Sequence, residues 1–226
     1  MRLIGIGDVH GCAATLDALL ARLAPRPEDH LVFVGDYVDR GPDSRGVIER
    51  LIRMEARSWD ASHPRCTFLR GNHDQMMLDY VEGTGDFDLW RVNGGLETLE
   101  SYARHDGPPD IPPEHAAFLR RTHLMLDTPG FAFVHAGLDP ALSVAENAAR
   151  ADAHVMLWSR EHLGAPSLEA WEKPVVCGHT PVPVPLSEPR LIAIDTGAVY
   201  ADREGLGRLT AVILPERTFV DVPYCG

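Results

Sequence analysis

The chain has 226 residues, 45% of them hydrophobic and 24% charged, and this composition is typical of one soluble globular domain with a sizeable core. Its formal net charge of −12 argues against broad, non-specific binding to nucleic acid or anionic membrane, because such binding needs a basic face. No apolar run is long enough to span a bilayer, and the first residues enter a polar motif instead of a cleavable signal peptide. We therefore expect a cytoplasmic monomer that binds neither nucleic acid nor membrane.

Three strand–loop–helix units follow one another in the first third of the chain. Apolar runs at 3–7, 31–34 and 66–69 predict buried strands of a parallel sheet, and each is followed by apolar residues at helical spacing. The polar loops after these strands are Asp8-Val9-His10-Gly11, Gly35-Asp36-Tyr37-Val38-Asp39-Arg40-Gly41 and Arg70-Gly71-Asn72-His73-Asp74. Because open α/β sheets bind ligands at the carboxyl ends of their strands, we expect the three loops to form one site.

The loop 35–41 brings two carboxylates, those of Asp36 and Asp39, close to the guanidinium of Arg40. Burying these three charges is costly unless a metal ion or a phosphate compensates them. Our hypothesis is that Asp36 bridges two metal ions and that Arg40 binds a phosphoryl oxygen.

The chain changes character from 83 to 123, where glycines and prolines interrupt short helical patterns. We interpret this segment as a helical insertion that covers the sheet edge or shapes the access of substrate, with a purely structural lid as the alternative. After it, a predicted hairpin at 124–134 leads to His135-Ala136-Gly137, and a short strand at 175–177 leads to Gly178-His179-Thr180.

A strand at 191–194 and a closing hairpin at 209–222 complete the predicted elements. Since the early part of the chain is βα and the later part mostly β, we predict an α/β fold with a central β-sandwich of two mixed sheets flanked by helices. We expect this fold to form a single domain over residues 1–226, with the polar motifs along one edge of the sandwich.

Carboxylates, imidazoles and an amide oxygen at the strand ends suit divalent metal ions. Asp8, His10 and Asp36 could hold one ion. A second ion could be held by four residues, of which Asp36 is shared: Asp36, Asn72, His135 and His179. Two-metal sites keep their ions ~3.5–4 Å apart and stabilise both ends of an in-line displacement at phosphorus. The mixed ligand set favours two Mn²⁺ ions, with Fe or Zn as alternatives.

Five motifs occur in a fixed order between residue 7 and about residue 180. They are Gly7-Asp8-Val9-His10-Gly11, Gly35-Asp36-Tyr37-Val38-Asp39-Arg40-Gly41, Arg70-Gly71-Asn72-His73-Asp74, Val134-His135-Ala136-Gly137 and Cys177-Gly178-His179-Thr180. The ordered set resembles the signature of the calcineurin-like metallophosphoesterases, whose fold is a four-layer α/β/β/α sandwich. The form of the second motif and the His-Ala-Gly motif resemble the phosphoprotein phosphatase branch and its bacterial and phage members.

The resemblance implies the metal ligands given above and a hydroxide between the two ions that attacks phosphorus in line. It also implies that His73 is the general acid that protonates the leaving alkoxide and that Asp39 orients it; such an acid contributes about 10²–10⁴-fold. Arg40 and Arg70 would bind the phosphoryl oxygens, and Arg160 resembles a third phosphate-binding arginine.

These motifs predict a serine/threonine protein phosphatase. A hydrolase of diadenosine tetraphosphate is the alternative within the class, since that group shares all five motifs. A catalytically inactive binding module is the alternative from another class, and the complete ligand set argues against it. For Asp195-Thr196-Gly197, a strand-end turn and a substrate contact remain open. For Asn93-Gly94-Gly95 and for Asp74, we expect a helix-start turn and a helix N-cap, respectively.

The four cysteines, Cys12, Cys66, Cys177 and Cys225, show no CxxC pairing, so we expect reduced thiols. Cys12 and Cys177 lie close to the polar motifs. We expect both thiols to be inert, and inactivation of the enzyme by their oxidation is the alternative.

Overall fold

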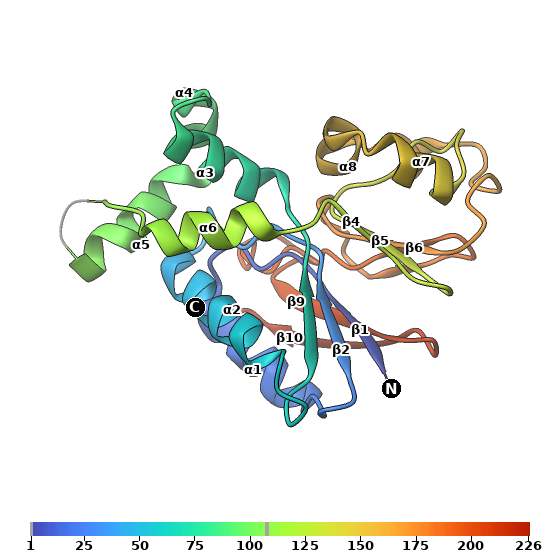
Figure 1. Cartoon of the computed structure of the whole chain (residues 1–226), viewed down its shortest axis with the longest axis horizontal. Helices are drawn as coiled ribbons and strands as arrows, with labels where there is room; N and C mark the ends of the chain where they lie inside the picture. The colour runs from blue at the N-terminus through green and yellow to red at the C-terminus, as the bar shows by residue number, and fades with distance from the viewer. Residues whose placement is uncertain (1, 107–108) are drawn as a thin grey trace.

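The computed structural model describes residues 2–106 and 109–226. It contains two five-stranded sheets packed face to face, with helices on the outer side of each sheet (Figure 1). The predicted α/β fold with a central sandwich of two mixed sheets is therefore confirmed. No helix in the described part of the chain is long and apolar enough to cross a membrane.

The first sheet has the strand order β10-β9-β1-β2-β3. Its strands are β1 (Leu3–Ile6), β2 (His30–Phe33), β3 (Arg65–Phe68), β9 (Arg208–Leu214) and β10 (Thr218–Pro223). Strands β1, β2 and β3 run parallel, whereas β9 and β10 pair antiparallel on the other side of β1. The parallel alignment places the carboxyl ends of β1, β2 and β3 at the same edge of the sheet.

The second sheet has the strand order β4-β5-β6-β8-β7. Its strands are β4 (Met125–Asp127), β5 (Ala132–Val134), β6 (Val175–Cys177), β7 (Leu186–Ser187) and β8 (Leu191–Ala193). The central strands β5, β6 and β8 are parallel, and the outer strands β4 and β7 are antiparallel to their neighbours. The motifs that follow β5, β6 and β8 therefore also share one edge.

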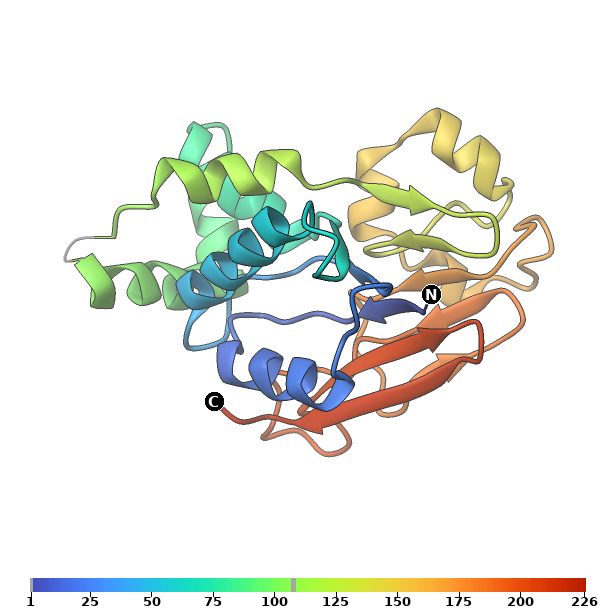
Figure 2. The same ribbon diagram turned by 60° about the horizontal axis from the view of Figure 1, so that its bottom comes forward.

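Helices α1 (Ala13–Leu23), α2 (Ser44–Arg57) and α3 (Asn72–Glu82) each follow one of the parallel strands of the first sheet. Figure 2 shows α1 and α2 on the side of this sheet that is turned away from the second sheet. The remaining helical elements are α4 (Phe87–Trp90), the π-helical turn η1 (Arg91–Gly95), α5 (Leu96–Asp106), α6 (Pro113–Arg121), α7 (Val144–Arg150), α8 (Ala153–Trp158) and α9 (Glu161–Gly164).

Strand β2 and the residue after it show why the core strands are apolar on both faces. Leu31 and Phe33 pack into the core between the first sheet and its helices, whereas Val32 and Val34 pack into the core between the two sheets. Successive side chains of a strand point to opposite faces, so a strand buried on both faces reads as an uninterrupted apolar run. A third core lies on the outer side of the second sheet and includes Val144 of α7 and Met156 of α8.

Candidate active site

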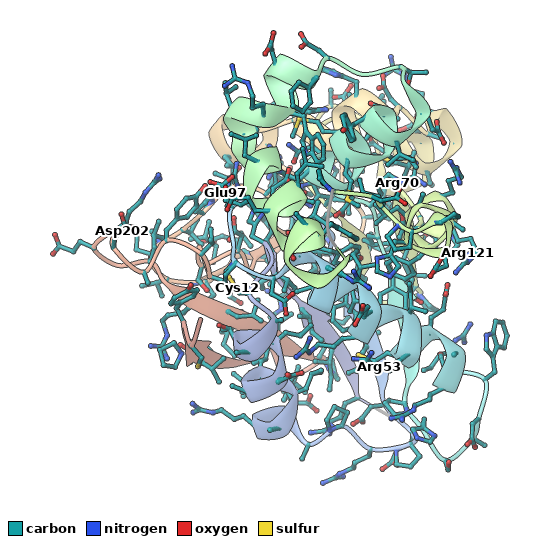
Figure 3. The ribbon with its side chains drawn as sticks, turned by 90° about the vertical axis from the view of Figure 1, so that its left-hand side faces the viewer. Cys12, Arg53, Arg70, Glu97, Arg121 and Asp202 are labelled. Atoms are coloured by element: carbon teal, nitrogen blue, oxygen red, sulfur yellow. The ribbon has the colours of Figure 1, made fainter. Side chains whose placement is uncertain are left out.

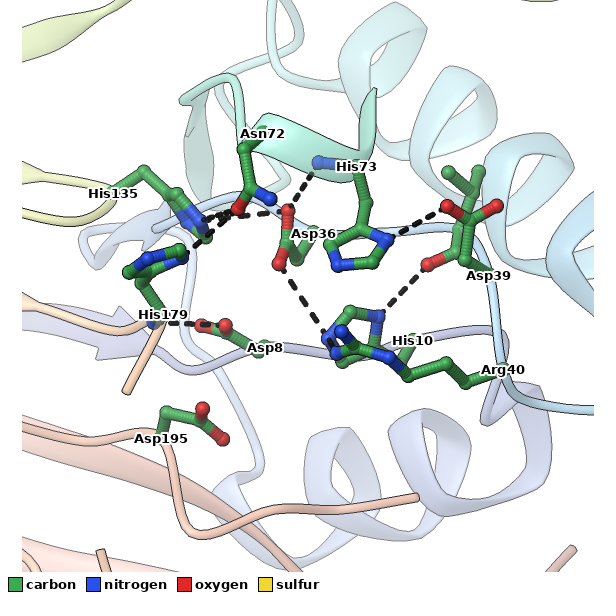
Figure 4. Close-up of polar contacts among 12 residues, drawn as sticks. Asp8, His10, Asp36, Asp39, Arg40, Asn72, His73, His135, His179 and Asp195 are labelled. Atoms are coloured by element: carbon green, nitrogen blue, oxygen red, sulfur yellow. Dashed lines mark hydrogen bonds and ion pairs between the residues drawn. The ribbon is translucent and has the colours of Figure 1, made fainter. Parts of the chain in front are cut away.

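The loops after β1, β2, β3, β5 and β6 meet at one edge of the sandwich (Figure 4). They bring together the six side chains that the sequence assigns to metal binding: Asp8, His10, Asp36, Asn72, His135 and His179. All six are buried, although they are polar or charged. The loops pack so closely that a Cβ added to Gly71 would lie 2.0 Å from Oδ1 of Asp36, so only glycine fits there.

Asp36 lies at the centre of this cluster. Its Oδ1 lies 3.5 Å from Nε2 of His135, and its Oδ2 lies 3.5 Å from Nε2 of His10. Oδ1 also accepts a hydrogen bond of 3.0 Å from the backbone N–H of His73. One carboxylate thus faces histidines from both sheets, which is the geometry that a ligand shared between two ions requires.

The histidine rings are oriented by backbone carbonyls. Nδ1 of His10 donates to the carbonyl of Val38 at 2.9 Å, and Nδ1 of His135 donates to the carbonyl of Val34 at 3.0 Å. These bonds leave Nε2 of each ring unprotonated and within 3.5 Å of Asp36, and a hydrogen bond on the other ring nitrogen is how metal-binding histidines are held.

Asn72 completes the group around His135 and His179. Its Oδ1 lies 2.9 Å from Nε2 of His135 and 2.9 Å from Nδ1 of His179. Three ligand atoms of Asp36, His135 and His179 lie within 4.8 Å of one another, and so do those of His10, Asp36 and His73. The two groups share Asp36.

The chemistry of these residues fits bound cations. In the described part of the chain, the buried Oδ1 of Asp8 has no hydrogen-bond partner, which is costly unless a ligand satisfies it. Burial lowers the pKa of His135 and of His179 to about 3, so both imidazoles are neutral and able to bind a metal. Burial and the nearby Asp195 and Asp36 hold the pKa of Asp8 well above its usual range, and a cation would reverse this.

His73 forms a hydrogen bond with Asp39 beside the ligand cluster. Nδ1 of His73 lies 2.7 Å from Oδ2 of Asp39. The Asp39 carboxylate also accepts hydrogen bonds from Nε1 of Trp90 at 2.9 Å and from Oγ1 of Thr98 at 2.8 Å. Burial raises the pKa of Asp39 well above its usual range and lowers the pKa of His73 to about 4, because a buried site disfavours the charged form of each group.

Trp90 and Thr98 are contacts that the sequence did not reveal. Trp90 ends α4 and Thr98 lies in the first turn of α5, so both belong to the segment 83–123. The sequence pattern that contains Trp90, Asn93-Gly94-Gly95 and Thr98 left the dinucleotide hydrolase open as an alternative, but it gave no signal that links Trp90 or Thr98 to His73. The segment thus does more than cover the sheet, because it holds the carboxylate that faces His73.

Strained backbone is concentrated in the site. Eight non-glycine residues within 2–106 and 109–226 have positive φ, and five of them are candidate site residues: His10 (44°), Asp36 (52°), Asp39 (74°), Arg40 (68°) and His179 (65°). Such conformations are unfavourable for L-residues by about 1–3 kcal/mol each and persist where the surrounding structure fixes them. Their clustering supports a functional reading of this edge.

The three arginines expected at the substrate take different positions. Nη1 of Arg40 lies 2.7 Å from Nε2 of His10, directly beside the ligand cluster. Arg160 is exposed, its Nε donates to Oγ1 of Thr180, and its charge contributes to the lowered pKa of His135 and His179. Both are therefore close enough to the cluster to contact a substrate there.

Arg70 differs from the expectation. Its guanidinium donates to the carbonyls of Leu119 and Arg120 at 2.8 and 3.0 Å and to Oγ1 of Thr122 at 3.0 Å. It caps the carbonyls at the end of α6, where a cation is favourable. In the view of Figure 3, Arg70 lies beside α6 and on the opposite side from Glu97. A phosphoryl contact by Arg70 would require these hydrogen bonds to break.

Asp74 is the third residue of α3 (N3), not its N-cap, and it ties two motifs together. Its Oδ2 accepts from the backbone N–H of Gly71 and of Asp36, each at 2.8 Å, and its Oδ1 accepts from Tyr37 at 2.9 Å. The N-cap of α3 is Gly71. Asp74 therefore connects the backbone of the loop that carries Asp36 to the backbone of the loop that carries Asn72.

The Asp74→Asn variant is expected to lose about 1–3 kcal/mol of unfolding free energy, because its amide NH₂ must face a backbone N–H and leaves that buried donor without an acceptor. Urea denaturation followed by circular dichroism measures this loss. Asp88→Asn, at an exposed side chain of α4, is the matched control and should be close to neutral. Equal stability of the two variants would contradict the anchoring role of Asp74.

The expected helix-start turn at 93–95 is a kink between α4 and α5 that supports Arg40. Gly94 has φ of 109°, and its carbonyl accepts from the backbone N–H of Arg40 at 3.2 Å. A Cβ on Gly94 would lie 2.6 Å from Cγ and 2.7 Å from N of Arg40.

We expect Gly94→Ala to lower kcat/KM by about tenfold or more, because the added methyl group displaces Arg40 by steric overlap. Steady-state hydrolysis of p-nitrophenyl phosphate measures the effect. Gly83→Ala is the matched control, since Gly83 also has positive φ but its Cβ would meet no atom within 4 Å. Gly83→Ala should lose about 1 kcal/mol of stability and keep its activity, whereas Gly94→Ala should lose more stability, because of the overlap, and also activity.

Asp195 lies beside Asp8 in the cluster (Figure 4), and its Oδ1 accepts from the backbone N–H of Gly197 at 2.8 Å. This is a strand-end turn after β8, one of the two readings that the sequence left open. Burial raises the pKa of Asp195 to about 7. Cys12 and Cys177 are buried, and burial raises the pKa of each thiol to about 12, which fits unreactive cysteines.

The fold and this cluster define a metallophosphoesterase. The family model described as calcineurin-like phosphoesterase matches residues 1–193, and the chain belongs to this family. It is therefore a phosphoester hydrolase of a family that depends on metal ions.

Two curated relatives have different names. The chain is 33% identical over 217 residues to serine/threonine-protein phosphatase 1 of Salmonella typhimurium, and the aligned region covers 90% of this chain and 90% of that protein. It is 28% identical over 246 residues to the asymmetrical bis(5'-nucleosyl)-tetraphosphatase PrpE of Oceanobacillus iheyensis, covering 98% of this chain and 92% of that protein. A solved metallophosphoesterase from Sphaerobacter thermophilus shares the fold, with a TM-score of 0.63, 22% identity and coverage of 100% and 90%.

Proposed function

We propose that the chain is a metal-dependent serine/threonine protein phosphatase. The observation that carries the proposal is the Asp39–His73 hydrogen bond of 2.7 Å beside the Asp36-centred ligand cluster, because it places an oriented imidazole next to the site of attack. The likeness to a serine/threonine phosphatase over 90% of the chain supports the same substrate class.

Two divalent ions, for which we propose Mn²⁺, would be held by Asp8, His10, Asp36, Asn72, His135 and His179. When bound, they supply the Lewis acidity that activates water and offsets phosphoryl charge. The neutral imidazoles and the unpartnered Oδ1 of Asp8 support this ligand set.

The chain's own groups then bind the substrate and move a proton. Arg40 and Arg160 bind phosphoryl oxygens, and their charge stabilises the negative charge that develops there. His73 donates the proton of its Nε2 to the leaving alkoxide, while Asp39 holds Nδ1 and keeps the ring aligned. The phosphoryl group favours the protonated imidazole, because an adjacent anion raises the proton affinity of a histidine. For Arg70 we retain a phosphoryl contact only as a prediction, since its donors bind the end of α6.

We also propose that the segment 83–123 is an integral part of one catalytic domain formed by residues 1–226. The hydrogen bonds from Trp90 and Thr98 to Asp39 support this, because they make the orientation of His73 depend on the insertion.

A second candidate function is hydrolysis of diadenosine tetraphosphate. It is favoured by the likeness to a bis(5'-nucleosyl)-tetraphosphatase over 98% of the chain. The test is a comparison of kcat/KM on a phosphoserine peptide and on diadenosine tetraphosphate, both with added Mn²⁺ and with the metal content measured by elemental analysis. We expect the phosphopeptide to be the better substrate, and a tenfold preference for the dinucleotide would overturn the first assignment.

A further inference from the structure

A cavity of about 470 Å³ opens directly beside Arg40, at the edge of the candidate active site. Its volume is within the range of small-ligand sites. It lies between the π-helical turn η1, which precedes α5, and the loop that follows β8. Its lining includes three arginines, Arg40, Arg91 and Arg203, one carboxylate, that of Glu97, and the ring of Tyr200.

The three arginines of this lining outnumber its one carboxylate, although the chain as a whole carries a net charge of −12. Arg203 and Arg40 place their guanidinium carbons 4.0 and 5.6 Å from the centre of the Tyr200 ring. In the described part of the chain Arg203 has no carboxylate partner, and Arg91 makes only an exposed contact of 3.3 Å with Asp88. Guanidinium groups that gather in a cavity without a buried carboxylate partner are suited to an anion.

The loop that carries Tyr200 and Arg203 is built by the turn at Asp195-Thr196-Gly197. The carbonyl of Gly197 accepts from the backbone N–H of Tyr200 at 2.8 Å and from that of Gly207 at 3.0 Å, which closes the loop at its base. Figure 3 shows Glu97 of α5 and Asp202 of this loop on the same side of the molecule. The turn after β8 thus sets the position of one wall of the cavity.

Arg40 connects the cavity to the ligand cluster. Its Nη1 lies 2.7 Å from His10, while its guanidinium carbon lies 5.6 Å from the Tyr200 ring that lines the cavity. A phosphoryl group at the cluster and an anion in the cavity would therefore lie on either side of one arginine. Since adjacent negative charges repel each other, a shared guanidinium is what two neighbouring phosphates need.

We propose that this cavity binds a second phosphate group of the same substrate, next to the phosphoester that is hydrolysed, through Arg203 and Arg91. The proposal rests on the phosphoesterase function proposed above and adds the chemical class of its substrate: one that carries two phosphates close together. The second phosphate can belong to a neighbouring phosphoresidue of a peptide or to a polyphosphate chain, and both would use the same guanidinium groups.

The experiment measures kcat/KM of the Mn²⁺-loaded enzyme on matched substrates. One pair consists of a peptide with one phosphoserine and the same peptide with a second phosphoserine two residues away. The other pair consists of p-nitrophenyl phosphate and diadenosine tetraphosphate. The kcat/KM on each of the four substrates is measured with the native chain, Arg203→Ala, Arg91→Ala and the control Arg53→Ala. The control removes an exposed arginine of α2 outside the cavity.

We expect the native chain to prefer at least one substrate that carries a second phosphate, and Arg203→Ala to reduce that preference by about tenfold, chiefly through KM. Arg91→Ala should act in the same direction, and Arg53→Ala should leave the preference unchanged. Loss of preference for the doubly phosphorylated peptide would identify a neighbouring phosphoresidue, and loss for the dinucleotide would identify a polyphosphate chain; either result supports the cavity.

Equal changes on both members of each pair, or no change with either cavity variant, would overturn the proposal. These outcomes differ from a failure of the underlying function, in which the native metal-loaded chain would hydrolyse none of the four substrates. Circular dichroism of Arg203→Ala and Arg91→Ala establishes that the variants are folded, as expected for two exposed side chains.

Discussion

Replacing His73 with asparagine is expected to lower kcat by about 10²–10⁴-fold on a phosphoserine peptide, because the amide cannot donate a proton to the leaving alkoxide. The loss should be smaller on p-nitrophenyl phosphate, whose leaving group is stable as an anion and needs little protonation. The measurement is the ratio of kcat values between native and variant enzyme on the two substrates.

The leaving-group dependence separates a proton donor from a residue that only shapes the site. The backbone N–H of His73 binds Asp36, and this contact survives the substitution, so the ligand cluster should keep its metal. Elemental analysis of the variant provides that control. Unchanged turnover, or an equal loss on both substrates, would show that His73 does not protonate the leaving group.

The Asp36→Asn variant is expected to lose both bound metal and turnover, whereas Asp39→Asn should lose turnover alone. The Asp36 carboxylate faces His10 and His135 with one oxygen each, and an amide offers a single weaker acceptor without charge. Elemental analysis after dialysis and kcat on p-nitrophenyl phosphate measure the two properties on the same sample.

The Asp39→Asn variant acts by another route. The carboxamide carries no negative charge to stabilise the protonated ring of His73, and only one of its two polar atoms can accept the hydrogen bonds that Asp39 now accepts from His73, Trp90 and Thr98. The ring loses its orientation for proton transfer, and we expect kcat to fall by roughly 10²-fold with metal content nearly intact. Metal loss equal to that of Asp36→Asn would place Asp39 among the ligands.

These two residues are three positions apart in one loop, yet they contact different parts of the site. Asp36 faces the histidines of both sheets, and Asp39 faces His73, Trp90 and Thr98. The neighbouring Arg40 lies between the ligand cluster and the basic cavity. The loop 35–41 therefore connects the proposed metal ligands, the proposed acid and the substrate.

The sequence by itself determined the sandwich of two mixed sheets and the residues that gather at its edge. Buried strands read as apolar runs because both of their faces are covered, as Val32 and Phe33 show by packing into different cores. Polar residues directly after parallel strands must share an edge, so the grouping of Asp36 with Asn72 followed from chain order alone.

Only the tertiary structure decided which side chains surround those residues. Arg70 belongs to one of the five motifs, but its guanidinium donates hydrogen bonds to carbonyls at the end of α6. No motif in the sequence links the loop 35–41 to Trp90, Thr98, Gly94 or Arg203. These four residues are far from the loop along the chain, and tertiary folding brings them close to it. Local periodicity specifies strands, helices and the ends of strands, whereas contacts between distant segments depend on how the helices pack, which no local pattern encodes.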